Sequence, residues 1–196
     1  LGLGRYGDPA GPGRDRRGAG MNRTRPIVTF RAQVTAQAPP GAVYRVLTEL
    51  RTHLTWAGEQ APQKTFRLLS LEAAGKEAVV GDRFSSTGAN MFSMQFVDAS
   101  LVVEADSGKH FGFDTDSKLE RKHRPALHTR FRHRYTLSAA GGGTAIGYSC
   151  DVWPQNYVPW WLRAGQRPMT KLMVQRSIRR NLKNLATLAA STPATR

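Results

Sequence analysis

The sequence predicts an α+β fold in which a curved antiparallel sheet of about seven strands wraps around a long C-terminal helix. Short runs of alternating apolar residues follow one another after residue 62, separated by turn residues. Connections this short join antiparallel neighbours. The last long stretch, 168–190, has the apolar spacing of an amphipathic helix. This helix is long enough to cover the one face that an antiparallel sheet must bury.

Residues 1–25 are predicted to form a disordered basic leader. They hold six arginines against two aspartates and almost no large apolar side chains, so burial cannot offset the entropy lost on ordering. Met21 is a candidate start of the native protein, and the residues before it would then be an upstream extension. A single domain is expected over residues 26–191, followed by a flexible tail at 192–196.

The predicted elements begin with a strand at 27–36, in which apolar residues alternate with polar ones. Two prolines end this strand and lead into a short amphipathic helix at 41–50, and a second helical turn is predicted at 53–56. The later strands are expected at 66–73, 81–87, 92–104, 109–116, 125–137 and 143–153. The alternation within 92–104 slips near Asp98, which predicts a bulge at that residue.

The terminal helix is predicted to have an apolar stripe and a cationic face. The stripe consists of Val174, Ile178, Leu182, Leu185 and Ala189, and the opposite face carries Arg176, Arg179, Arg180 and Lys183. Continued toward the N-terminus, the stripe meets Lys171 and Arg167, while Met169, Leu172 and Met173 fall on the far side. Either the helix bends or begins late, near Pro168, or the two cations point into the mouth of a cavity.

We predict the second arrangement, with the Met-Leu patch packed under Trp160 and Trp161. These tryptophans lie in the segment 154–168, which is rich in proline and aromatic residues. The segment could form a lid over the cavity or lie at a membrane interface. Alternatively, the tryptophans close the core where the last strand leads into the helix.

Several short motifs together carry a family resemblance. The opening VTFRAQVTAQAPPGAVYRVLTELRTHLTWAG gives a strand, a proline-led helix and an aromatic residue near a second short helix. Later come GDRF at 81–84, the hairpin at 108–113 and the GGT turn at 142–144. With these features the region 27–190 resembles the START-like, helix-grip proteins of the polyketide cyclase/dehydrase and lipid transport (SRPBCC) family. The resemblance implies a cavity between the curved sheet and the terminal helix that holds an apolar or amphipathic small molecule.

Strand alternation predicts which side chains would face such a cavity, with Arg130, Arg132 and Arg134 on the outer face. The candidate ligand-binding residues are Phe92, Met94, Phe111, Phe113, Phe131, His133, Tyr135, Tyr148, Arg167, Lys171 and Ile178. Aromatic and sulfur-bearing side chains with a few polar groups are typical of small-molecule pockets. A filled core would have nearly the same composition, so both interpretations stay open.

His133 is the candidate acid–base residue because its phase places it among apolar neighbours, where its pKa could move toward a catalytic range. Tyr135 or Tyr148 would be its partner in proton transfer. The alternative is a structural histidine, hydrogen-bonded to one of these tyrosines across strands. The sequence has no metal-ligand cluster, phosphate-binding glycine loop or Ser-His-Asp arrangement, and we expect no metal or cofactor. Asp98, Asp114 and Asp116 look like turn or solvent positions, and Asp151 is expected on the outer face.

The expected function is binding or carriage of a lipid or polyketide-like molecule. The alternative is a cyclase or dehydratase, a lyase-type enzyme that positions a reactive chain and transfers protons through His133. The net charge of +15, concentrated at 118–134 and 163–183, also allows contact with an anionic membrane. Nucleic acid is an unlikely partner because no nucleic-acid-binding motif accompanies the charge. The single cysteine, Cys150, and the lack of a membrane-spanning run suggest a cytoplasmic protein.

Overall fold

The computed structural model describes residues 25–58, 66–75, 77–90, 95–123, 125–155 and 168–192. Within them, seven strands form one antiparallel sheet in the order β1-β7-β6-β5-β4-β3-β2. The strands are β1 (Val28–Ala36), β2 (Phe66–Glu72), β3 (Arg83–Asn90), β4 (Gln95–Asp106), β5 (His110–Leu119), β6 (Leu127–Ala140) and β7 (Gly143–Pro154). The helical elements are α1 (Pro40–Thr48), the 3-10 turn η1 (Leu50–Thr52), α2 (His53–Trp56) and α4 (Pro168–Ser191).

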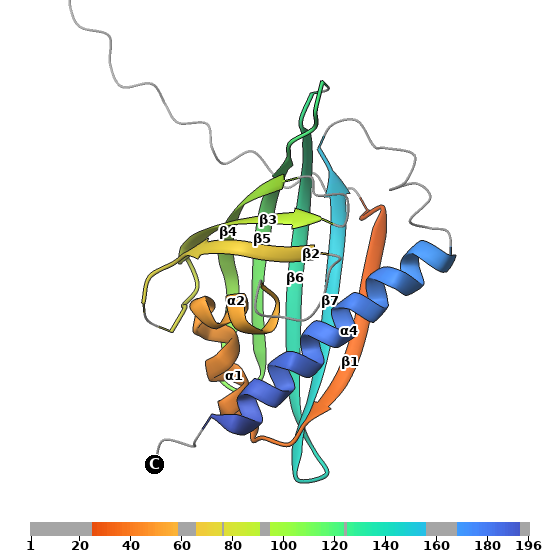
Figure 1. The fold of residues 1–196 in the computed structure, drawn as a ribbon. Coiled ribbons are helices and arrows are strands. Elements are labelled where there is room, and N and C mark those ends of the chain that lie inside the picture. The colour runs from red at the N-terminus through yellow and green to blue at the C-terminus, as the bar shows by residue number, and fades with distance from the viewer. Residues whose placement is uncertain are drawn as a thin grey trace, which may run out of the picture.

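The sheet curls so that β2 and β3 run across the direction of β6 and β7 (Figure 1). The short helices α1 and α2 lie at one end of the concave face, and α4 runs diagonally along β1 toward them. Helix α4 packs against β1, α1 and α2. This arrangement confirms the predicted helix-grip fold. No helix in the described part of the chain is both long and apolar enough to cross a membrane.

The element boundaries agree with the sequence prediction to within a few residues, except around β4. The predicted bulge near Asp98 is wrong, because the register between β4 and β5 shifts between Val102 and Glu104 instead. Asp98 therefore lies within a regular part of the strand. The predicted turn between β6 and β7 is confirmed. It contains Gly141 and Gly142, whose φ angles of +54° and +83° suit a tight hairpin that favours glycine.

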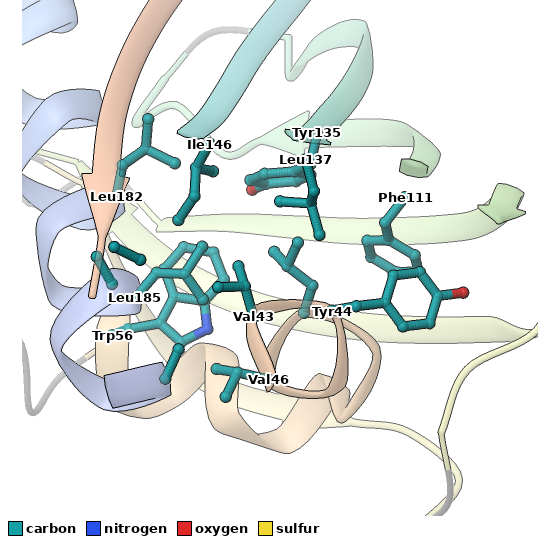
Figure 2. Packing of buried hydrophobic residues seen from close by; sticks show 14 of the residues in the cluster. Val43, Tyr44, Val46, Trp56, Phe111, Tyr135, Leu137, Ile146, Leu182 and Leu185 are labelled. Atoms are coloured by element: carbon teal, nitrogen blue, oxygen red, sulfur yellow. The ribbon is translucent and has the colours of Figure 1, made fainter. Parts of the chain in front are cut away.

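The apolar stripe of α4 is confirmed in its C-terminal half. Leu182 and Leu185 are 1% and 0% exposed, and Ala189 is also buried. Figure 2 shows Leu182 and Leu185 near Val43 of α1 and Trp56 of α2. The same buried cluster includes large side chains from the strands, namely Phe111, Tyr135, Leu137 and Ile146. The hydrophobic core thus lies at the end of the concave face that α1 covers.

Along the concave face, the register of the strands orders side chains into rows, and polar side chains become more frequent from the first row near α1 to the fifth. Nearest α1 lies the pair Leu137 and Ile146, followed by the row of Phe111, Tyr135 and Tyr148. The third row contains Val102, Phe113, His133 and Cys150, and the fourth contains Phe84, Ser100, Thr115, Phe131 and Val152. The fifth row contains Ser86, Asp98, Ser117 and Thr129, and beyond it lies an apolar row of Phe96, Leu119 and Leu127.

The outer face of the sheet carries charge, and much of this charge is paired. Arg132 donates two hydrogen bonds of 2.7 Å to the carboxylate of Asp114, and Arg130 donates one of 3.2 Å to Asp116. Arg134 Nε lies 3.8 Å from Glu104. The prediction that Asp114 is a turn or solvent residue is therefore wrong, because it is a partly buried strand residue paired with arginine.

A hollow of about 430 Å³ lies beside these pairs on the outer face, and its cationic lining consists of Arg31, Arg134 and Arg179.

We expect Leu185→Ala to lower the free energy of unfolding by about 2–5 kcal/mol, because it leaves a cavity where α4 meets α1. Urea unfolding followed by circular dichroism measures this change. Lys183→Ala, two residues away on the exposed face, is the matched control and is expected to change it by at most about 0.5 kcal/mol. Equal losses in the two variants would contradict the packing described for α4.

Candidate functional site

The middle of the concave face holds a histidine in contact with a group of aromatic rings. His133 Nδ1 lies 2.8 Å from the hydroxyl oxygen of Tyr148 on the neighbouring strand, within hydrogen-bond distance. On its other side the imidazole stacks on Phe113, with 4.6 Å between ring centroids. The rings of Tyr135 and Tyr148 are 4.9 Å apart. Adjacent antiparallel strands place these side chains next to one another, as the alternation predicted.

The residues predicted to line a cavity divide into two groups by exposure. Phe111, Phe113 and Tyr135 are buried and belong to the hydrophobic core. Phe131, His133 and Tyr148 are only partly buried, although they face inward from the middle of the sheet. Ile178 of α4 is also partly buried and packs against the core. The second group is therefore the part of the predicted lining that a ligand could contact.

Burial sets the protonation state of the central residues. Burial, with a smaller contribution from nearby His53, lowers the pKa of His133 to about 4. Burial also raises the pKa of Tyr148 and that of Tyr135 above their ordinary values. At neutral pH the imidazole and both phenols are therefore uncharged. The His133–Tyr148 pair can donate or accept a hydrogen bond, and the neutral imidazole can accept a proton, but only as a weak base.

The sequence analysis did not identify His53 of α2 as an interior residue. Its Nε2–H donates a hydrogen bond of 2.9 Å to the backbone carbonyl of Leu47, and its ring centroid lies 6.3 Å from that of Phe113. A carbonyl only accepts hydrogen bonds, so this bond places the proton of the neutral ring on Nε2. Burial lowers the pKa of His53 to about 4. Its position next to Leu54 in a predicted helical turn gave no signal that it faces inward.

Asp98 is the second interior residue that the sequence analysis missed, and here the structure overturns an explicit prediction. Asp98 lies on the concave face of β4, in phase with Ser100 and Val102, and not in a turn. Its Oδ1 is buried and has no hydrogen-bond partner among the residues that the structure describes. Burial raises its pKa to about 6, and a hydrogen bond from Ser117 opposes the shift. Unbroken alternation through β4 would have placed this residue inside.

Four of the candidate binding residues have no described side chain. Phe92, Met94 and Arg167 lie outside the described residues, as do Trp160 and Trp161, and the side chain of Lys171 is not described either. Leu172 and Met173 are 46% and 49% exposed, and the predicted packing of this patch under the tryptophans involves residues outside the described ranges. Within the described ranges, no group of three or more His, Cys, Asp and Glu residues could hold a metal ion.

Fold and site together define a helix-grip protein whose concave face is aromatic and only partly covered. The family model described as "Polyketide cyclase / dehydrase and lipid transport" matches residues 28–190. The chain belongs to this family, whose members bind hydrophobic ligands, and the predicted resemblance is confirmed. No curated protein matches the chain in sequence.

Several solved structures share the fold. An uncharacterized protein from Rhizobium leguminosarum has a TM-score of 0.60 at 14% identity, covering 84% of this chain and 95% of its own. Protein CV1439 from Chromobacterium violaceum has a TM-score of 0.57 at 16% identity, covering 84% and 99%. Ara h 8.0201 has a TM-score of 0.55 at 16% identity, with the same coverage of 84% and 99%. At these identities the likeness concerns the fold alone.

We expect His53 to make the protein less stable in acid. Its folded-state pKa of about 4 lies below the ordinary histidine pKa of 6.5, so the unfolded chain binds the proton more readily between these pH values. The free energy of unfolding therefore falls as the pH drops through this window. His53→Gln does not titrate, and we expect the loss between pH 7 and about pH 4.5 to shrink by roughly 2 kcal/mol.

Urea unfolding at the two pH values measures this change in stability. His128→Gln, at an exposed histidine of β6, is the control and should leave the pH dependence as in the wild type. An unaltered acid loss in His53→Gln would show that protonation of this buried ring does not limit stability.

Proposed function

We propose that the protein binds or carries an apolar or amphipathic small molecule, lipid-like or polyketide-like, on the concave face between the sheet and α4. The observation that carries the proposal is the partial burial of Phe131, His133 and Tyr148, which face inward from central strands. Inward-facing aromatic residues that the protein's own side chains do not fully cover provide apolar surface for a ligand.

The arrangement of the rows supports the same proposal. A ligand site in a protein usually combines a mainly apolar lining with a few oriented polar groups. On the concave face Phe131 contributes apolar lining, and the His133–Tyr148 pair supplies oriented polar atoms beside it. Membership of a family that binds hydrophobic ligands supports a ligand of this class.

We expect a bulky residue on the concave face to displace the ligand. Thr129 is partly buried in the inward phase of β6, whereas Thr136 of the same strand is exposed in the outward phase. Native mass spectrometry of protein purified from its own host should detect a retained apolar molecule in the wild type and in Thr136→Trp. The same molecule should be lost, or reduced at least about tenfold, in Thr129→Trp. A wild-type protein that is repeatedly empty, or equal retention in both variants, would contradict the proposed site.

A second candidate function is that of a cyclase or dehydratase, favoured by the 2.8 Å contact between His133 Nδ1 and Tyr148. In this mechanism the neutral imidazole removes a proton from a chain held against the aromatic residues, and a neutral tyrosine hydroxyl donates a hydrogen bond to a substrate oxygen. Positioning of the chain supplies most of the acceleration, since a base with a pKa of about 4 is weak at neutral pH.

If the retained molecule or a polyketide-like chain is turned over, His133→Gln should lower kcat by about a hundredfold or more. The wild-type rate should fall as the pH drops below about 4, where His133 becomes protonated and can no longer accept a proton. The residual rate of His133→Gln should not show this fall at acid pH. Steady-state kinetics across pH measures both effects, and an unchanged rate in His133→Gln would exclude this residue as the base.

A further inference from the structure

Far from α1, and just before a final apolar row of the concave face, lie an acid and a group of hydroxyls. The strand register places Ser86 and Ser117 on either side of Asp98, and Ser100 and Thr115 in the adjacent row. All four hydroxyl residues are buried. The hydroxyls of Ser100 and Thr115 are 2.8 Å apart and satisfy each other, and Ser117 donates a hydrogen bond to Asp98. This cluster lies next to Phe131, whose register partner is Thr115.

The carboxylate of Asp98 is incompletely satisfied in this environment. Its Oδ1 is buried and has no hydrogen-bond partner among the described residues. The described strand positions of the concave face carry no lysine or arginine, and Arg130 and Arg132 of the same sheet point outward to Asp116 and Asp114. A buried ionised group without a cation and with a free acceptor costs stability.

A purely structural role does not require an acid at this position. A serine or an asparagine could receive the hydrogen bond from Ser117 without placing a charge inside the protein. By contrast, an ionised carboxylate beside hydroxyls provides a strong acceptor for a group that enters from the interior. Polar groups that the fold leaves unsatisfied are the ones that a ligand can satisfy.

We propose that Asp98, together with Ser86, Ser100, Thr115 and Ser117, forms the polar end of the ligand site. The Asp98 carboxylate accepts a hydrogen bond from a hydroxyl or an ammonium group of an amphipathic ligand. The apolar body of that ligand lies along Phe131 toward His133 and Tyr148. This inference rests on the proposed function and adds the chemistry of the ligand: a donating head on an apolar or aromatic body. An anionic head is excluded from this end because it would face the carboxylate directly.

Four probes with a common naphthalene body test the inference at pH 7.5. 2-Naphthylmethanol donates a hydrogen bond, its methyl ether only accepts one, 2-naphthylmethylamine is an ammonium cation, and 2-naphthoate is an anion. Dissociation constants come from probe fluorescence or calorimetry. For the wild type, we expect the alcohol or the amine to bind at least about tenfold more tightly than the ether, and the anion to bind most weakly. Whichever donor binds more tightly identifies the head group.

Asp98→Asn should reduce this preference to less than about threefold, while binding of the ether changes little. The variant removes an uncompensated buried carboxylate, so it should be at least as resistant to urea as the wild type at pH 7.5, which rules out misfolding as the cause. Asp116→Asn is the matched control on the outer face of β5 and should keep the wild-type preference.

The outcomes separate this inference from the proposed function. If the ether binds and Thr129→Trp abolishes its binding, the apolar site is present. The role of Asp98 would then be overturned by any of three results: equal binding of all four probes, tightest binding of the anion, or an unaltered preference in Asp98→Asn. The apolar site itself would still be supported. If none of the four probes binds to the wild type, both proposals fail.

Discussion

The contact between the C-terminal half of α4 and α1 closes one end of the concave face of the sheet. Leu182, Leu185 and Ala189 bury their side chains there, in the same cluster as Val43 and Trp56. An antiparallel sheet of seven strands has one long inner face to bury, and the described part of α4 buries its own apolar residues most fully near α1. The N-terminal half of α4 contributes less, since Leu172 and Met173 remain exposed and Val174 and Ile178 are only partly buried. Farther along the inner face, Phe131, His133 and Tyr148 are only partly buried and provide surface for another function.

The composition of the concave face follows from this uneven cover. Where α1 and α4 exclude water, the rows contain Phe111, Leu137 and Ile146, and a polar group there would pay the full cost of desolvation. Farther along, polar side chains occur, and most of them have partners within the protein. His133 lies within hydrogen-bond distance of Tyr148, and Ser100 lies within that distance of Thr115. Asp98 differs because one oxygen has no partner in the described part of the chain. The fold explains polar groups that have hydrogen-bond partners, whereas a carboxylate with one unpartnered buried oxygen calls for an additional explanation.

The order of elements could be predicted from the sequence. Turn residues and the spacing of apolar residues reflect local structure, and this local structure persists in the fold. The sequence also placed His133 and Tyr148 on the inner face, since alternation continues unbroken through β6 and β7. It failed for Asp98 because an acid amid apolar residues suggested a break in alternation, while the actual bulge follows Val102. It failed for His53 because burial of a four-residue helix depends on what packs over it, which no local pattern encodes. Likewise, alternation alone could not distinguish core residues from residues that could line a ligand site. Phe113 and Phe131 both face inward, but Phe113 is buried and Phe131 is only partly buried.

The distribution of charge argues that net charge does not identify the ligand. The excess of +15 allows contact with an anionic membrane, yet the described arginines of β6 lie on the outer face. There Arg130, Arg132 and Arg134 are matched with Asp116, Asp114 and Glu104. Inside, the charge that a ligand would meet is the carboxylate of Asp98. Water screens the outer cations, whereas a partly desolvated carboxylate acts at short range with less screening. The inner face should therefore select a ligand by its hydrogen-bond donors, while the outer charge governs solubility and contact with other surfaces.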